Sequence, residues 1–197
     1  MPDLNQIEVN KIICGWEIYK MIAGVHGDIV ECGVFKGDSL LRLAFYRRIF
    51  NDDRAIIGFD TFGKFPEATY KPDMPLRADF VRNQGEGLSV ADIRRLLLNK
   101  GCGWAYLIEG DICQTVPQYA KARPELEIAL LNLDTDLYEP AKVILEHFYP
   151  LVAKGGIIIT DNYNIFPGET KAVNEFCQRH NTEVKSLDLF RYYYIRK

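Results

Sequence analysis

Apolar positions along the chain fall into two alternating patterns. Short, nearly continuous apolar runs predict buried strands over residues 28–34, 55–61, 104–111, 127–137 and 156–163. Between them, apolar residues at helical spacing predict helices over residues 38–50, 89–101, 115–123, 139–155 and 168–180. A further helical pattern covers residues 4–24, and residues 182–197 contain two strand-like runs close together.

This alternation predicts a parallel sheet with helices on both faces, because each strand is apolar on both sides. The last two strands follow each other without a helix, so we expect an antiparallel hairpin at one edge of the sheet. The expected fold is therefore α/β: a Rossmann-like class I methyltransferase fold with a mostly parallel seven-stranded sheet. We expect a single domain over residues 1–197, with an N-terminal helical segment at residues 1–27.

Residues 62–88 interrupt the alternation between the second strand and the next helix. The segment is polar and contains three prolines. Long loops in compact domains are usually functional or disordered. This one leaves the carboxyl end of a strand, where open α/β sheets bind ligands. We predict a lid loop over a substrate, with a plain surface insertion as the alternative.

Composition narrows the classes of function. The 197 residues are 48% hydrophobic and 26% charged, with a formal net charge of −3. No basic stripe marks a nucleic-acid-binding face, and no apolar run is long enough to span a membrane. The first residues lack the basic start and apolar core of a secretory signal. The five cysteines form no disulfide or zinc pattern, so we expect reduced thiols and a cytoplasmic protein.

The sequence ECGVFKG over residues 31–37 indicates a nucleoside site. Its two glycines let the backbone turn sharply and let a ligand or a helix approach. The next helix begins with Asp38, which would repel the pyrophosphate of a dinucleotide. S-adenosylmethionine (SAM) carries a sulfonium, an ammonium and a carboxylate but no phosphate. We therefore expect SAM rather than a dinucleotide.

Acids also end the second and third predicted strands. Asp60 follows Gly37 at roughly the 20-residue spacing of an acid that holds ribose hydroxyls. Asp111 is placed to accept a hydrogen bond from an adenine amino group, although either acid could instead be a helix cap or a surface charge. The predicted cofactor-binding residues are Glu31, Gly33, Phe35, Gly37, Ser39, Asp60, Thr61, Gly110, Asp111 and Asp134.

Carboxylates gather at the ends of the fourth and fifth predicted strands. Asp134 and Asp136 are two residues apart and face the same way, and Asp161 and Asn162 end the neighbouring strand. Without a cation, their repulsion would raise at least one pKa. Oxygen ligands from aspartate and asparagine suit Mg²⁺, although these residues could instead cap the following helices. No histidine is expected at this edge, so Asp134 or Asp136 is left as the base that deprotonates a hydroxyl.

Five motifs occur along the chain in the order VECGVFKGDS, GFDTFGKFP, LDTDLYEP, GGIIITDNY and AVNEF. Together they resemble the macrocin O-methyltransferase (TylF-like) family, from about residue 28 to residue 176. The resemblance implies a SAM- and Mg²⁺-dependent enzyme that methylates sugar hydroxyls of natural products. It implies Asp134, Asp161 and Asn162 as metal ligands, with Asp134 also as base. The expected partner is a small-molecule hydroxyl acceptor, and a homo-oligomer is left open.

Two features depart from that family. It usually has two adjacent aspartates where this chain has Asp161 and Asn162, and the glycine of FDTFGKFP is shifted by one position. An Asp-Asn pair resembles catechol O-methyltransferase, but Leu137 stands where catechol enzymes place a lysine. Catechol-type methyl transfer is therefore one alternative. An NAD-dependent oxidoreductase and a non-catalytic SAM-binding protein are alternatives of another class. Asp38 and the terminal hairpin argue against the oxidoreductase. The acid cluster argues against a protein that only binds SAM.

Overall fold

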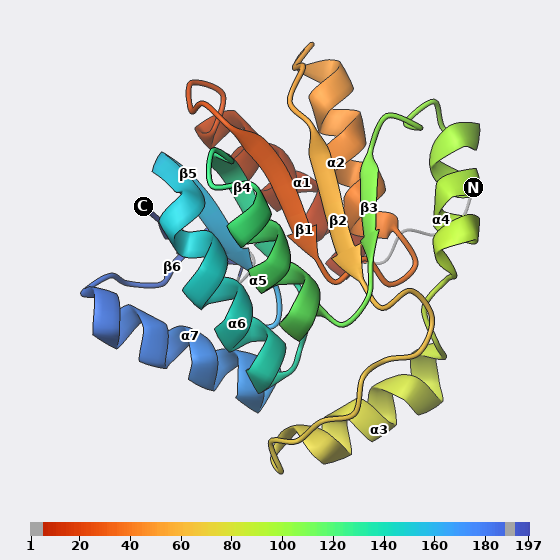
Figure 1. The fold of residues 1–197 in the computed structure, drawn as a ribbon, viewed down its shortest axis with the longest axis vertical. Coiled ribbons are helices and arrows are strands. Elements are labelled where there is room, and N and C mark those ends of the chain that lie inside the picture. Colours follow the sequence, from red (N-terminus) through yellow and green to blue (C-terminus); the bar gives the residue numbers. More distant parts are fainter. Residues whose placement is uncertain (1–5, 188–191) are drawn as a thin grey trace.

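The computed structural model describes residues 6–187 and 192–197, and its strands form one sheet (Figure 1). The strand order is β3-β2-β1-β4-β5-β7-β6. The strands are β1 (Asp28–Cys32), β2 (Ile56–Asp60), β3 (Tyr106–Glu109), β4 (Ile128–Leu133), β5 (Val152–Thr160), β6 (Lys185–Leu187) and β7 (Tyr192–Arg196). Strands β1 to β5 pair in parallel, whereas β7 pairs antiparallel with β5 and β6. The predicted parallel sheet and terminal hairpin are both confirmed.

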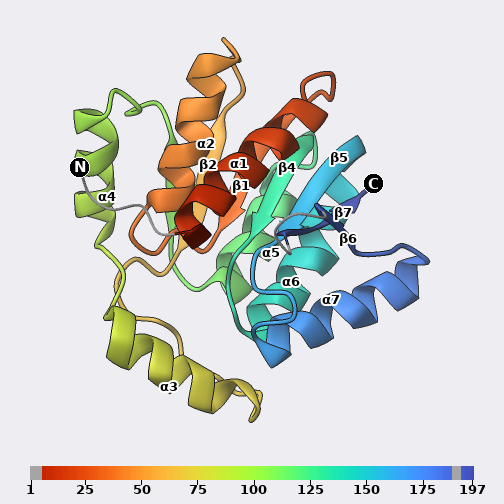
Figure 2. The same ribbon diagram turned by 180° about the vertical axis from the view of Figure 1, so that it is seen from behind.

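Helices cover both faces of the sheet (Figures 1 and 2). They are α1 (Gln6–Met21), α2 (Asp38–Ile49), α3 (Asp73–Gln84), α4 (Val90–Asn99), α5 (Ile112–Ala122), α6 (Tyr138–Phe148) and α7 (Pro167–His180). Apolar side chains of α1, α2 and α4 pack on one face, and those of α5, α6 and α7 pack on the other. Neighbouring strand residues such as Ile29 and Val30 enter opposite cores. Burial on both faces explains the nearly continuous apolar runs of the strands.

The predicted helix over residues 139–155 is too long. Helix α6 ends at Phe148, a 3-10 turn covers Tyr149–Leu151, and β5 begins at Val152. Pro150 gives the physical reason, because it has no N–H and its ring would clash with the preceding helical turn. The turn of the terminal hairpin, residues 188–191, and the first five residues of the predicted N-terminal segment lie outside the described residues.

The insertion at residues 62–88 is a helix between two loops rather than one loop. Helix α3 lies beyond the carboxyl ends of the strands in Figure 1. Pro75 lies in the first turn of α3, where its missing N–H breaks no helical hydrogen bond. Arg77 ties the preceding loop to α3 by donating to the carbonyls of Phe65 (2.8 Å) and Pro66 (2.7 Å). The insertion is therefore held together by contacts of its own.

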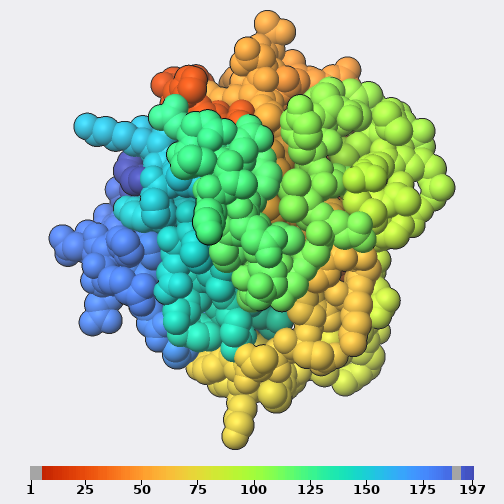
Figure 3. Space-filling view, in the orientation of Figure 1, coloured from red at the N-terminus to blue at the C-terminus, as the bar shows by residue number. Residues whose placement is uncertain are grey.

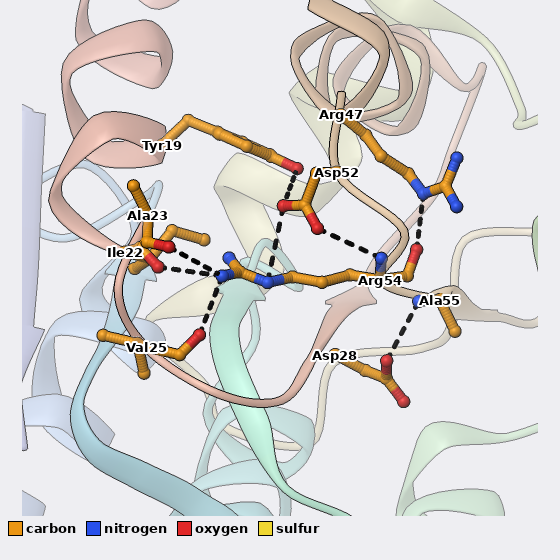
Figure 4. Close-up of polar contacts among 9 residues, drawn as sticks. All are labelled: Tyr19, Ile22, Ala23, Val25, Asp28, Arg47, Asp52, Arg54 and Ala55. Atoms are coloured by element: carbon orange, nitrogen blue, oxygen red, sulfur yellow. Dashed lines mark hydrogen bonds and ion pairs between the residues drawn. The ribbon is translucent and has the colours of Figure 1, made fainter. Parts of the chain in front are cut away.

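Arg54 fixes the end of α1 at the opposite, amino-terminal edge of the sheet (Figure 4). Its Nη2 donates to the carbonyls of Ile22 at 3.0 Å and Val25 at 2.7 Å, and its Nε lies 3.4 Å from Asp52. The Ile22 carbonyl also accepts the amide of Val25 at 2.9 Å, so the Arg54 guanidinium adds a second donor there and supplies one to the Val25 carbonyl. A hollow of ≈ 660 Å³ beside this cluster is lined in part by His26, so this histidine lies at the edge of the sheet opposite the acid-bearing strand ends.

Two further expectations concern the whole chain. The part of the chain that the structure describes contains no helix long and apolar enough to cross a membrane. All five cysteines are free thiols, and four of them are buried. The four buried cysteines are therefore packing residues, whereas Cys113 is partly exposed and lines the cleft described below.

Candidate active site

A cleft of ≈ 1290 Å³ opens at the carboxyl ends of the strands. Its walls are the start of α1, the β1–α2 turn, the insertion and the ends of β4 and β5. In the space-filling view the insertion forms the end of the molecule beyond these strands (Figure 3). The strand order reverses between β1 and β4, and ligands of open α/β sheets usually bind at such a switch point. The lining residues include Gly33, Phe35, Ser39, Asp60, Thr61, Asp111 and Asp134, whereas Glu31, Gly37 and Gly110 do not line the cleft.

Packing of the protein on itself requires the first glycine of the β1–α2 turn, and a left-handed backbone conformation favours the second. Gly33 has a φ of 98°, and a Cβ at this position would lie 1.7 Å from the carbonyl oxygen of Asp134. Gly37 has a φ of 88°, and a Cβ there would lie 3.1 Å from Ile93 in α4. The close approach that the sequence predicts is therefore between chain segments. Gly33 also lines the cleft, so the turn lies against both β4 and the ligand space.

Asp60 holds the β1–α2 turn in place. Its Oδ2 accepts hydrogen bonds from the amides of Val34 (2.6 Å) and Phe35 (2.9 Å), and its Oδ1 accepts one from Phe62 (2.8 Å). Phe35 and Phe62 have φ values of 51° and 52°, a region that such residues rarely adopt. The carboxylate stabilises this backbone and lines the cleft at the same time. Its contact with ribose stays a prediction.

Glu31 is wholly buried under the cleft. Its Oε1 accepts hydrogen bonds from the Ser39 hydroxyl and from Asn132 Nδ2, whereas its Oε2 has no partner among the described residues. Burial raises the pKa of Glu31 to about 8, although the bond from Ser39 opposes this effect. Ser39 lines the cleft, so Glu31 acts on that space through the serine hydroxyl.

The remaining cofactor candidates belong to two loops. Asp111 is the N-cap of α5, and its Oδ1 accepts the amide of Cys113 at 2.9 Å. Asp111 therefore caps α5 and also lines the cleft, and its contact with adenine stays a prediction. Thr61 donates its hydroxyl to the carbonyl of Lys64 at 2.9 Å. Gly110 adopts a φ of 142° between β3 and α5 and lies outside the cleft wall.

The acid cluster forms at the ends of β4 and β5, as predicted. Asn162 Nδ2 donates to Asp134 Oδ1 at 2.9 Å, and Asp161 Oδ2 lies 2.6 Å from Lys11 Nζ. Burial and then the charge of Asp161 raise the pKa of Asp134 to about 7, while Lys11 and Asn162 lower it. Lys11 comes from α1, where sequence reasoning placed no functional residue. A positive charge already lies beside these acids, on a protein side chain.

Asp136 lines the cleft beside Asp134 with a φ of 64°. Its side chain accepts no hydrogen bond from any residue in the described ranges. Burial, followed by the charges of Asp134 and Asp161, raises its pKa well above the usual carboxyl range. Glu169, another residue that sequence reasoning missed, accepts the backbone amides of Asp136 (3.2 Å) and Asn162 (2.9 Å). This buried carboxylate joins the end of β4 to the end of β5.

The donor set of the acid cluster fits a divalent cation such as Mg²⁺. Asp134 and Asp161 offer carboxylate oxygens and Asn162 offers an amide oxygen, and Mg²⁺ takes few protein ligands and keeps several waters. The Lys11 ammonium at Asp161 shows that this position accepts positive charge. Within residues 6–187 and 192–197, no three His, Cys, Asp or Glu side chains are grouped to hold a metal. Asn162 would therefore have to complete the ligand set.

Known proteins resemble the chain over most of its length. Mycinamicin III 3''-O-methyltransferase of Micromonospora griseorubida is 30% identical over 179 residues, which cover 85% of this chain and 67% of that protein. Demethyldecarbamoylnovobiocin O-methyltransferase of Streptomyces niveus is 30% identical over 160 residues, which cover 77% of this chain and 58% of that protein. The chain thus spans between about half and two thirds of the length of these curated relatives.

Solved structures confirm the fold. The calicheamicin methyltransferase CalS11 superposes with a TM-score of 0.83 at 28% identity, covering 98% of this chain and 80% of that one. The O-methyltransferase NovP also gives 0.83, at 24% identity, covering 98% of this chain and 81% of that one. The macrocin O-methyltransferase (TylF) family matches residues 17–196. The chain therefore belongs to the macrocin O-methyltransferase (TylF) family of SAM-dependent O-methyltransferases.

Proposed function

We propose that this protein transfers a methyl group from SAM to a hydroxyl on a sugar of a natural product. The observation that carries the proposal is the packing of Gly33, in the nucleoside-type turn, against the backbone of Asp134 in the acid cluster. A donor over the turn and a hydroxyl beside the acids would therefore be neighbours. Relatives support a sugar acceptor: one is a TDP-rhamnose 3'-O-methyltransferase, and another is a 4'-O-methyltransferase of a rhamnosyl-tetracenomycin.

Asp134, Asp161 and Asn162 are the residues that would hold Mg²⁺. When bound, the cation would lower the pKa of an acceptor hydroxyl by stabilising the alkoxide. Asp136 is the residue that accepts the proton, because its carboxylate lines the cleft and no described residue donates to it. Asp134 is less free for that role, since Asn162 holds its Oδ1. We therefore assign the base to Asp136, in place of the family-based expectation of Asp134.

The insertion supplies an apolar cover for the reaction. The ring centroids of Phe35 and Phe80 are 5.2 Å apart, and those of Phe65 and Phe80 are 5.3 Å apart. All three rings line the cleft, so the turn and the insertion form one aromatic wall. Methyl transfer needs an oxygen about 3 Å from the methyl carbon, in line with the leaving sulfur. A wall that excludes water restricts attack to the bound hydroxyl.

Methyl transfer should require a divalent cation. Exhaustive chelation should abolish transfer from radiolabelled SAM to a panel of deoxysugars, both nucleotide-linked and glycoside-linked, and added Mg²⁺ should restore it. Binding of S-adenosylhomocysteine, measured by calorimetry, should change by no more than roughly twofold, because the metal would hold the acceptor rather than the donor. Full transfer after chelation would contradict the metal assignment.

Two variants sharpen this test. Asp161→Asn should weaken Mg²⁺ binding and transfer together, because it removes one of two anionic ligands. Glu183→Gln changes a carboxylate whose side chain is 78% exposed. This control variant should alter neither Mg²⁺ binding nor methyl transfer. Methylation of catechols but of no sugar would favour the catechol-type alternative, whereas failure to bind S-adenosylhomocysteine would contradict the donor itself.

A further inference from the structure

Arg42 is a cation of the cleft wall without a partner. It lines the cleft and forms no hydrogen bond, ion pair or cation–π contact with any residue in 6–187 or 192–197. The other lining cations are all engaged: Lys11 with Asp161, Lys36 with the carbonyl of Gln84, and Lys64 with Glu67. The five N–H donors of a guanidinium are therefore free for a ligand at this one place in the described cleft wall.

The location of Arg42 indicates which part of a ligand it would meet. Arg42 follows Ser39 by three residues on α2, so the two side chains share a helix face, and both line the cleft. The positive charge of Arg42 lowers the pKa of Glu31 and of Asp134, which places its guanidinium near the ends of β1 and β4. It also lowers the pKa of Lys11 on α1. Arg42 therefore lies where the strand order reverses, between β1 and β4, on the side of the cleft toward α1.

The chemistry of the donor matches this position. SAM has one anionic group, the carboxylate at the end of its methionine moiety. A planar guanidinium binds a carboxylate with two parallel hydrogen bonds, a geometry that lysine cannot reproduce. The predicted ribose and adenine contacts, Asp60 and Asp111, end β2 and β3 on the other side of β1. An adenosine moiety over those strands would direct the methionine moiety across Gly33 toward Arg42.

We infer that Arg42 binds the carboxylate of the methionine moiety of SAM. The inference assigns a binding role to a residue of α2 that no motif in the sequence indicates. It rests on SAM as the donor and is independent of the identity of the acceptor and of the metal. Neighbouring acids such as Asp134 and Asp136 would repel that carboxylate, so Arg42 also fixes the direction in which the donor lies.

Calorimetry with two ligands tests this inference. The ligands are S-adenosylhomocysteine and its decarboxylated analogue, which keeps the adenosine and the amino group. Arg42→Ala should weaken binding of S-adenosylhomocysteine about tenfold to a hundredfold, the cost of a charged hydrogen-bond pair. It should leave binding of the decarboxylated analogue unchanged within roughly twofold. Arg42→Lys should be intermediate, because it keeps the charge and loses the two-pronged geometry.

The controls separate this inference from its alternatives. Arg48→Ala, on the same helix but outside the cleft wall, should bind both ligands as the unchanged protein does. If Arg42→Ala lost the same factor of affinity for both ligands, the inference would be overturned, since this result would show general damage to the site. Unchanged binding of S-adenosylhomocysteine by Arg42→Ala and Arg42→Gln would also overturn it. If Arg42→Ala fails to fold, Arg42→Gln and Arg42→Lys provide the same comparison.

Discussion

Asp136 has the properties of a functional residue at the scale of a single side chain. Its positive φ and its raised pKa both carry an energetic cost, and Glu169 holds the backbone in place by accepting its amide. Strained residues and shifted pKa values gather at catalytic sites, where the surrounding structure supports them. The buried Glu169 bonds to both acid-bearing loops, so it is a positioning residue for Asp136 and Asn162.

Asp136→Asn should reduce turnover by about a hundredfold to ten-thousandfold, the range that a general base contributes. Donor binding should be retained, because the substitution keeps the shape of the side chain. A raised pKa means that the carboxyl stays protonated at pH values where ordinary aspartates are ionised. Turnover of the unchanged enzyme should therefore fall as the pH drops through that raised pKa. The residual turnover of Asp136→Asn should not show this decrease at low pH.

The comparison variant is Asp134→Asn. It should weaken Mg²⁺ binding, because Asp134 is assigned as a ligand, and part of its activity should return at high Mg²⁺ concentration. Stopped assays with radiolabelled SAM across a pH series measure both variants. Near-normal turnover by Asp136→Asn, together with an inactive Asp134→Asn at saturating Mg²⁺, would return the base to Asp134.

At the scale of elements, one buried carboxylate joins the insertion to the starts of two helices. Asp73, the first residue of α3, is fully buried. Its Oδ1 accepts the amide of Gly168 at 2.7 Å and its Oδ2 accepts the amide of Tyr138 at 3.1 Å. Those amides begin α7 and α6, where the helix dipoles favour a negative charge. A Cβ on Gly168 would lie 1.9 Å from Asp73, so glycine is required for this contact.

Asp73→Asn should loosen the insertion. Replacing one carboxylate oxygen by an NH₂ group turns one of these hydrogen bonds into a clash of two donors, which costs about 1.5–3 kcal/mol. Hydrogen exchange should accelerate in residues 65–84 and stay slow in the strands, and the acceptor KM should rise more than the donor Kd. The control is Asp79→Asn on the same helix, whose carboxylate is 55% exposed and pairs with Arg82. Equal exchange rates in both variants would contradict the anchoring role.

The elements show what a sequence can and cannot predict here. The strands and the covering helices could be predicted because their apolar spacing records burial, and the acids at strand ends could be grouped because parallel strands end at one edge. Helix α3 could not be predicted, because Asp73 is its only buried residue and because the three prolines of the insertion suggested a loop. Lys11 meets Asp161 across 150 residues and Asp73 meets Gly168 across 95, and no local pattern encodes such contacts.

At the scale of the whole molecule, α1 is held at both ends and closes one side of the cleft. Arg54 and Tyr19 fix its carboxyl end at the far edge of the sheet, while Lys11 reaches Asp161 at the carboxyl edge. Between these points, Tyr46 of α2 donates its hydroxyl to the carbonyl of Ile12 at 2.7 Å. The same ion pair therefore secures the helix and neutralises a proposed metal ligand.

Lys11→Met should strengthen Mg²⁺ binding and loosen the start of α1. A cation bound as proposed would have to share or displace the ammonium at Asp161, and a partly exposed ion pair of this kind contributes up to about 1 kcal/mol. Removing it should tighten the Mg²⁺ Kd about fivefold, as measured by calorimetry without any acceptor. Methionine keeps the length and the apolar stem of lysine, so packing along the helix is retained.

The matched control lies on the same helix. Lys20→Met removes a lysine that pairs with Glu17, with both side chains about half exposed, far from the acid cluster. It should leave the Mg²⁺ Kd unchanged, and hydrogen exchange at the start of α1 should stay slow. Because Lys11 lowers the pKa of Asp134, its removal should also raise that pKa further and increase the pH dependence of Mg²⁺ binding. An unchanged Mg²⁺ Kd in Lys11→Met would show that the cation and the ammonium do not compete for Asp161, and that α1 acts on the cleft by packing alone.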